Sequence, residues 1–282
     1  MTPLLALASA VLVGASDFLA GVVSRRSAPV RVAALAQFVS FALSLPVAAA
    51  VGADRVTTGD AGWSAASGVA VAAGLTLFYT AMRRGLISLV APIAAVTGAS
   101  VPVAYALSRG ERPGAAALTG IALALPAIAI VSIAPGRGAR TAGADPVVIA
   151  LAVAAGALFG LFFVCLAHTS SDAGLWPVAI SRFASTAALS ALVLALGRPA
   201  NGAPARPAAG AVLAIGALEF AATVTLVLAL QRGPLAIASV LASLYPVTTV
   251  MLAAAVLRER LTRLQLTGVA LALAAVGLVS TA

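Results

Sequence analysis

Long apolar segments, separated by short groups of arginines and turn residues, make up almost the whole chain. Each segment has about twenty residues, the length with which an α-helix crosses the core of a bilayer. Short strands with alternating apolar and polar residues are absent, which argues against an outer-membrane barrel. The pattern predicts an all-α membrane protein with ten transmembrane helices: Leu4–Val23, Val32–Gly52, Gly62–Met82, Leu86–Leu107, Ala115–Ile133, Asp145–Ala167, Leu175–Leu196, Pro207–Leu230, Pro234–Leu257 and Leu264–Thr281.

Composition supports this class and excludes others. Hydrophobic residues make up 62% of the chain and charged residues only 9%, whereas a soluble domain has about a quarter of its residues charged. The net charge is +9, but the basic residues are all arginines scattered between apolar segments, so nucleic-acid binding is not indicated. The single cysteine, Cys165, cannot form an internal disulfide, and we expect neither a metal nor a cofactor.

An internal repeat divides the chain. At an offset of 148 residues, Glu111-Arg112 matches Glu259-Arg260, and Leu118-Thr119-Gly120 matches Leu266-Thr267-Gly268. The sequence therefore predicts two related five-helix units, residues 1–140 and 141–282. Because five is odd, the two units must cross the membrane in opposite directions. Such inverted repeats are a recurrent design of transporters, with the substrate site near mid-depth between the repeats.

The residues between the fourth and fifth segments resemble a known family. Arg109-Gly110-Glu111-Arg112, followed by Leu118-Thr119-Gly120, is similar to the corresponding connection in EamA-type transporters of the drug/metabolite transporter superfamily. Leu257–Thr262, followed by Gln265–Gly268, is similar to the same motif in the second half. The resemblance implies a ten-helix inverted-repeat fold with a central cavity. It also implies a secondary carrier in the cell inner membrane, without parts that hydrolyse ATP.

The distribution of arginine bears on orientation. The odd-numbered connections between segments carry twelve arginines and the even-numbered ones four. By the positive-inside rule, the odd-numbered connections are cytoplasmic and both chain ends lie outside. The family resemblance implies cytoplasmic ends. Both lines of argument place the two ends on the same side of the membrane.

Three ionisable residues fall inside predicted spans, where a charge costs about 2.5–3.5 kcal/mol without a partner or a watery cavity. Glu219 is the deepest acid, and Asp17 lies on the first helix. Either carboxyl group is a candidate for proton coupling and substrate binding, while the alternatives are a structural ion pair for Glu219, for example with Arg182, and interfacial hydration for Asp17. Arg182 could pair with an acid or bind an anionic group, but we favour a side chain that extends to the lipid headgroups.

Prolines mark two candidate hinges. Pro92 and Pro246 are expected to interrupt the fourth and ninth helices, because proline removes a backbone donor and broken helices line binding sites in carriers. Further candidate substrate-binding residues are Tyr79, Thr97, Ser243 and Tyr245. Other polar residues have simpler interpretations. Gln37 is expected to hold helices together, Glu111 to form local ion pairs with neighbouring arginines, and His168 to lie in a solvated turn.

These features predict a secondary transporter that moves a small metabolite or drug-like molecule by alternating access, with proton-coupled export of amino acids or other amines as one candidate form. A passive channel is the main alternative. A membrane enzyme is less favoured, because one histidine and scattered acids do not form a catalytic cluster. The expected partners are a small-molecule substrate, the lipid bilayer and protons. The sequence is compatible with a monomer and with a homodimer.

Overall fold

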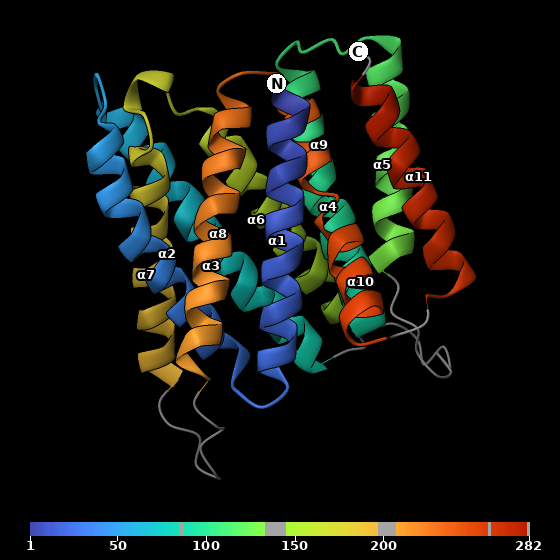
Figure 1. Cartoon of the computed structure of the whole chain (residues 1–282), viewed down its shortest axis with the longest axis horizontal. Helices are drawn as coiled ribbons and strands as arrows, with labels where there is room; N and C mark the ends of the chain where they lie inside the picture. Colours follow the sequence, from blue (N-terminus) through green and yellow to red (C-terminus); the bar gives the residue numbers. More distant parts are fainter. Residues whose placement is uncertain (85–86, 133–144, 197–206, 259–260, 281–282) are drawn as a thin grey trace.

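A computed structural model describes residues 1–84, 87–132, 145–196, 207–258 and 261–280. This part of the chain is a bundle of helices without strands (Figure 1). Ten spans are long and apolar enough to cross a membrane, with α9 and α10 together forming one of them. The helices are α1 Thr2–Ser24, α2 Pro29–Val51, α3 Thr58–Arg84, α4 Ile87–Ser108, α5 Ala115–Ser132, α6 Pro146–Ala167, α7 Trp176–Leu196, α8 Ala209–Leu230, α9 Leu235–Ala242, α10 Tyr245–Val256 and α11 Arg263–Ser280, with a short 3₁₀ turn at Ser171–Ala173.

The two prolines predicted as hinges behave differently. The ninth span breaks at Ser243 and Leu244, and Pro246 follows in the first turn of α10. Backbone N–H groups in the first turn have no intrahelical acceptor, so a proline there removes no helical hydrogen bond. Helix α4, in contrast, is continuous through Pro92, so the predicted interruption there is wrong. Packing of α4 against α5, α6 and α9 explains this, because neighbouring helices hold a membrane helix together despite a proline.

The bundle has two ends with different compositions. At one end, which we call the terminal end, α1 begins, α11 ends, and Asp60 at the start of α3 meets Ser170 after α6 (Figure 1). At the opposite end, which we call the arginine-rich end, Arg25 and Arg26 follow α1 and Arg258 follows α10. The two chain ends thus share a side, as the sequence predicts.

Counterpart helices of the two halves run in opposite directions. The start of α3 and the end of α8 both lie at the terminal end, as do the end of α4 and the start of α9. Their packing also exchanges between halves: α3 contacts α6 and α7, while its counterpart α8 contacts α1 and α2. Gly68 in α3 and Gly216 in α8 are separated by the repeat offset of 148 residues. Each allows a close crossing with the opposite half, at Ser181 and at Val39 respectively.

The hydrophobic core is unevenly distributed along the bundle. Its largest cluster crosses the bundle near the terminal end, with Ala6, Ala106, Leu166 and Leu230 among its members, and extends along α5 as far as Ile128. Towards the arginine-rich end, the described residues form two separate small clusters. One joins α3, α4 and α6 around Val90, and the other joins α1, α2 and α8. The bundle is therefore packed across its width at the terminal end and divided at the arginine-rich end.

Candidate functional site

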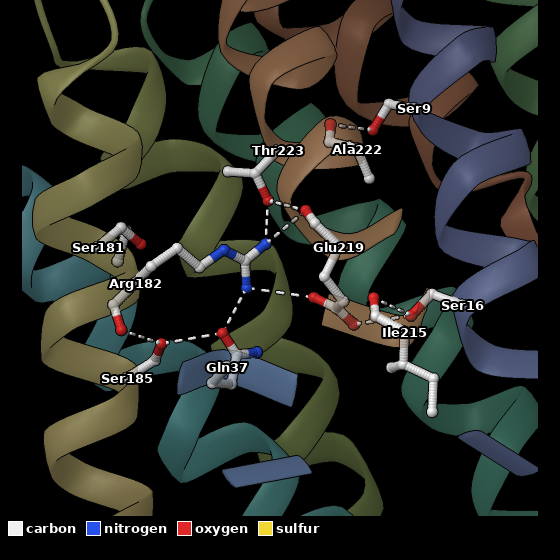
Figure 2. A network of polar contacts seen from close by, with 11 residues as sticks. Ser9, Ser16, Gln37, Ser181, Arg182, Ser185, Ile215, Glu219, Ala222 and Thr223 are labelled. Carbon is white, nitrogen blue, oxygen red and sulfur yellow. Dashed lines mark hydrogen bonds and ion pairs between the residues drawn. The ribbon is translucent and has the colours of Figure 1, made fainter. Parts of the chain in front are cut away.

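A buried guanidinium group joins three helices near the middle of the bundle. Arg182 of α7 is only 4% exposed. Its Nη1 atom lies 3.2 Å from Oε2 of Glu219 on α8 and donates a 2.6 Å hydrogen bond to Oε1 of Gln37 on α2 (Figure 2). Nη2 donates to the backbone oxygen of Glu219, at 3.1 Å, and to the hydroxyl of Thr223. The prediction that Arg182 extends to the headgroups is therefore wrong, because helical partners satisfy its charge inside the bundle.

Two serines add hydrogen bonds to this network, one at Gln37 and one at Glu219. Ser185, one turn after Arg182, donates a 3.1 Å hydrogen bond to Oε1 of Gln37. Ser16 of α1 lies on the other side of the carboxyl group and donates to Oε1 of Glu219 at 3.4 Å (Figure 2). Both serines are buried. Glu219 thus lies between a fixed cation and a neutral donor, with its side chain 25% exposed.

Removing two charged groups from water is costly unless hydrogen bonds and the partner charge compensate. Here the guanidinium group has two side-chain oxygens, one backbone oxygen and one carboxylate as partners, but its Nε has none in the described structure. For Glu219, the sequence leaves open a structural ion pair as the alternative to proton coupling, and the contact with Arg182 is that ion pair. The pair joins α7 to α8, and the bond from Arg182 to Gln37 of α2 connects it to the first half of the chain.

Asp17 has a different environment. It is exposed, and it lines a pocket between α1 and α10 that extends towards the arginine-rich end. The other lining residues lie on one face of α1 and on the facing side of α10: Phe18, Gly21, Val22, Arg25, Thr249, Ala253 and Leu257. The close approach that positions this pocket occurs at Gly14, where an added Cβ would lie 2.6 Å from the backbone oxygen of Tyr245. A carboxyl group within a membrane span is thereby accessible from one end.

Both predicted tyrosines lie within electrostatic range of the acids. Tyr79 of α3 interacts electrostatically with Asp17 and Glu219, and Tyr245 at the start of α10 interacts with Asp17. Asp17 and Glu219 also interact with each other in this way. Both tyrosines are half-buried. The structure therefore brings together five of the predicted site residues, from α1, α3, α7, α8 and α10.

The other predicted residues lie apart from the acids. Thr97 is half-buried on α4, where it closely faces Gly156 of α6. Ser243 is buried, 3% exposed, at the break between α9 and α10. Pro92 lies within α4 and Pro246 in the first turn of α10. Within the described part of the chain, these four residues form no hydrogen bond or ion pair with either carboxyl group.

Two contacts at the terminal end differ from what the sequence predicts. Glu111 does not serve a local arginine in the described structure but accepts hydrogen bonds from the N–H groups of Leu235 and Ala236. His168 is not an isolated residue in a solvated turn. Its Nε2 is 2.9 Å from the hydroxyl of Tyr105, and its ring stacks on Trp63. No local sequence signal marks these contacts, because each joins residues that are far apart in the chain.

Comparison with known proteins agrees with this architecture. A solved structure described as "Crystal structure of protein" has a TM-score of 0.76 with this chain at 19% identity, covering 99% of this chain and 96% of its own, which shows a shared fold. No curated protein matches the chain. Residues 147–281, which contain Arg182, Glu219 and Tyr245, match the model of the EamA-like transporter family. The second half of the chain is thus similar to the EamA-like transporter family, and the ten apolar spans are those of a multi-pass membrane protein.

Proposed function

We propose that the chain is a secondary transporter that carries a small amine-bearing molecule by alternating access. The observation that carries this proposal is the position of Asp17. Its carboxyl group lies within a membrane span yet is exposed to a pocket towards the arginine-rich end, while the terminal end is closed by a continuous core. An intramembrane acid of this kind is by default a functional residue.

The charges around the site favour a cationic group. Arg182 is balanced by Glu219, so the Asp17 carboxyl group is a further acid that can pair with a cationic group of a substrate. Tyr79 and Tyr245 lie within electrostatic range of Asp17 and carry aromatic rings and hydroxyl groups, which suit an ammonium group. Primary amines, including amino acids, are the substrate class that this combination fits best.

The proposed alternating-access mechanism requires that the two halves of the chain are inverted repeats. Counterpart helices run in opposite directions and exchange packing partners, which supports this view. In such a fold, the two halves can adopt each other's conformations. The arrangement closed at the terminal end would then convert into one closed at the arginine-rich end, with the site exposed to opposite sides in turn.

Proton coupling is assigned to Asp17 rather than to Glu219 in this proposal. The carboxyl group of Glu219 is already engaged in the ion pair with Arg182. Asp17 is the more accessible carboxyl group, so a proton and an ammonium group can compete for it. Release of the amine on protonation would allow a proton gradient to drive transport.

Replacement of Asp17 with asparagine tests the proposal. A thermal-shift screen of purified protein with primary amines and amino acids first selects the probe, because a bound ligand raises the melting temperature. In proteoliposomes, Asp17→Asn should weaken probe binding by about 10- to 100-fold, the effect of losing a charge-assisted contact, and should abolish pH-driven uptake. Asp54→Asn, at an exposed position in the connection between α2 and α3, is the matched control.

The outcomes separate the candidate functions. A carrier shows uptake of labelled probe that is accelerated by unlabelled probe on the opposite side, whereas a channel does not. Wild-type binding and pH-driven uptake in Asp17→Asn would contradict the role of Asp17. Absence of accelerated exchange in the wild-type protein would favour the passive channel.

A further inference from the structure

Glu111 provides the N-terminal cap of a helix in the other half of the protein. Helix α9 is preceded by Pro234 and has no side-chain cap from its own segment. Oε1 of Glu111 accepts a 2.8 Å hydrogen bond from the N–H of Leu235, and Oε2 accepts a 3.1 Å bond from the N–H of Ala236. A carboxylate is favourable at this position because the helix N-terminus carries unpaired donors and a partial positive charge.

The location of this contact gives it a role beyond capping. Glu111 belongs to the connection between α4 and α5 of the first half, and α9 belongs to the second half. Asp60 makes a parallel contact nearby, where its Oδ1 accepts a 2.7 Å hydrogen bond from the N–H of Ser170. At the terminal end, two carboxylates of the first half therefore hold backbone donors of the second half, above the continuous core.

Helix α9 leads directly to the candidate site. It has only eight residues before the break at Ser243 and Leu244, and Tyr245 follows at once. Displacement of the N-terminus of α9 therefore changes the position of a residue beside Asp17. Glu111 is half-buried, so water can replace its backbone partners when the helix moves.

We propose that Glu111 is the residue that keeps the terminal end closed: its carboxylate holds α9 in place while the pocket at Asp17 is accessible from the arginine-rich end. Loss of this clamp opens the terminal end and shifts the protein towards the opposite conformation. The inference rests on the alternating-access mechanism proposed above. Glu111 is a positioning residue, because it acts through α9 and does not contact the substrate.

Thiol labelling tests the clamp without any substrate. Ser239 lies on α9, one turn after Leu235, and is fully buried, so Ser239→Cys places a reporter behind the closed end. In reconstituted protein treated with a membrane-impermeant maleimide from the terminal side, adding Glu111→Gln should raise the labelling rate of this reporter by about ten-fold or more, equivalent to losing one charge-assisted hydrogen bond. Arg112→Gln alters the charge of the same connection at an exposed position and should leave the rate unchanged.

A second buried reporter, Val148→Cys near the opposite end of α6, distinguishes opening from unfolding. The native Cys165 is replaced by alanine in every variant, because it lies in the last turn of α6 at the terminal end. Faster labelling of Ser239→Cys alone supports the clamp. An unchanged rate would overturn the proposal, and equal acceleration at Val148→Cys would show that Glu111 merely stabilises the fold. Since no transport is measured, faster labelling combined with absent amine exchange would disprove the proposed function and leave the clamp intact.

Discussion

Replacement of Arg182 with methionine is expected to lower the free energy of unfolding by about 3 kcal/mol, among the largest effects of any single substitution in the bundle. The change leaves the Glu219 carboxylate without its cation and removes one of the two donors to Oε1 of Gln37. Breaking a buried pair costs roughly 3–5 kcal/mol, and the lower end applies because the Glu219 side chain is 25% exposed. Unfolding by denaturant in detergent micelles measures the change.

A double variant separates the charge from the packing. Arg182→Met combined with Glu219→Gln removes both charges, so most of the lost stability should return. Arg112→Gln removes an exposed arginine and should have little effect. If Arg182→Met alone is as stable as the wild type, the ion pair makes no net contribution and the buried network in Figure 2 does not hold the halves together.

Replacement of Gly216 with leucine is expected to prevent α8 from packing against α2. Even a single Cβ at this position would lie 2.5 Å from Cβ of Val39 and 2.8 Å from the backbone oxygen of Ala36. A leucine must therefore push the helices apart, at a cost of about 3 kcal/mol or more. Glu219 lies on the next turn, so the same displacement strains its ion pair with Arg182, which also donates to Gln37 of α2.

The matched control lies on the same helix. Gly210 is exposed, and a Cβ there meets nothing within 4 Å. Gly210→Leu should be neutral or stabilising, by up to about 1 kcal/mol, because leucine favours a helix more than glycine does. Size-exclusion profiles and melting temperatures in detergent compare the two variants. Equal stability of Gly216→Leu and Gly210→Leu would show that α8 and α2 do not approach closely at Gly216.

The helical architecture could be predicted because the bilayer imposes a simple rule on sequence. Backbone groups must pair within each span, so an apolar run of sufficient length becomes a helix. The prediction also placed the ninth break next to Pro246. It was wrong at Pro92, because whether a proline breaks a membrane helix depends on neighbours that a single sequence does not reveal.

The candidate site could be predicted only in part. Position within an apolar span identified Asp17, Arg182 and Glu219 as candidates, since each is ionisable. The choice between a headgroup contact and an ion pair for Arg182 depended on which side of α7 faces α8 and α2. In an alanine-rich helix such as α7, apolar residues occur on the lipid-facing side and on the inward side. A scarcity of polar residues therefore does not identify which side faces the lipid. Glu111 was assigned to its neighbours in sequence because its true partners lie 124 residues away.

That separation has a consequence for how the protein is made. Translation adds about 5–20 residues per second, so roughly 6–25 seconds pass between synthesis of Glu111 and synthesis of Leu235, 124 residues later. During the first part of this interval, α3 lacks both α6 and α7, its main packing partners, and α1 lacks a complete α8 until shortly before Leu235 is added. Polar side chains of the first five helices, such as Gln37, therefore remain without their final partners until the later helices are inserted. Until then, these helices must be accommodated by the insertion machinery or by lipid.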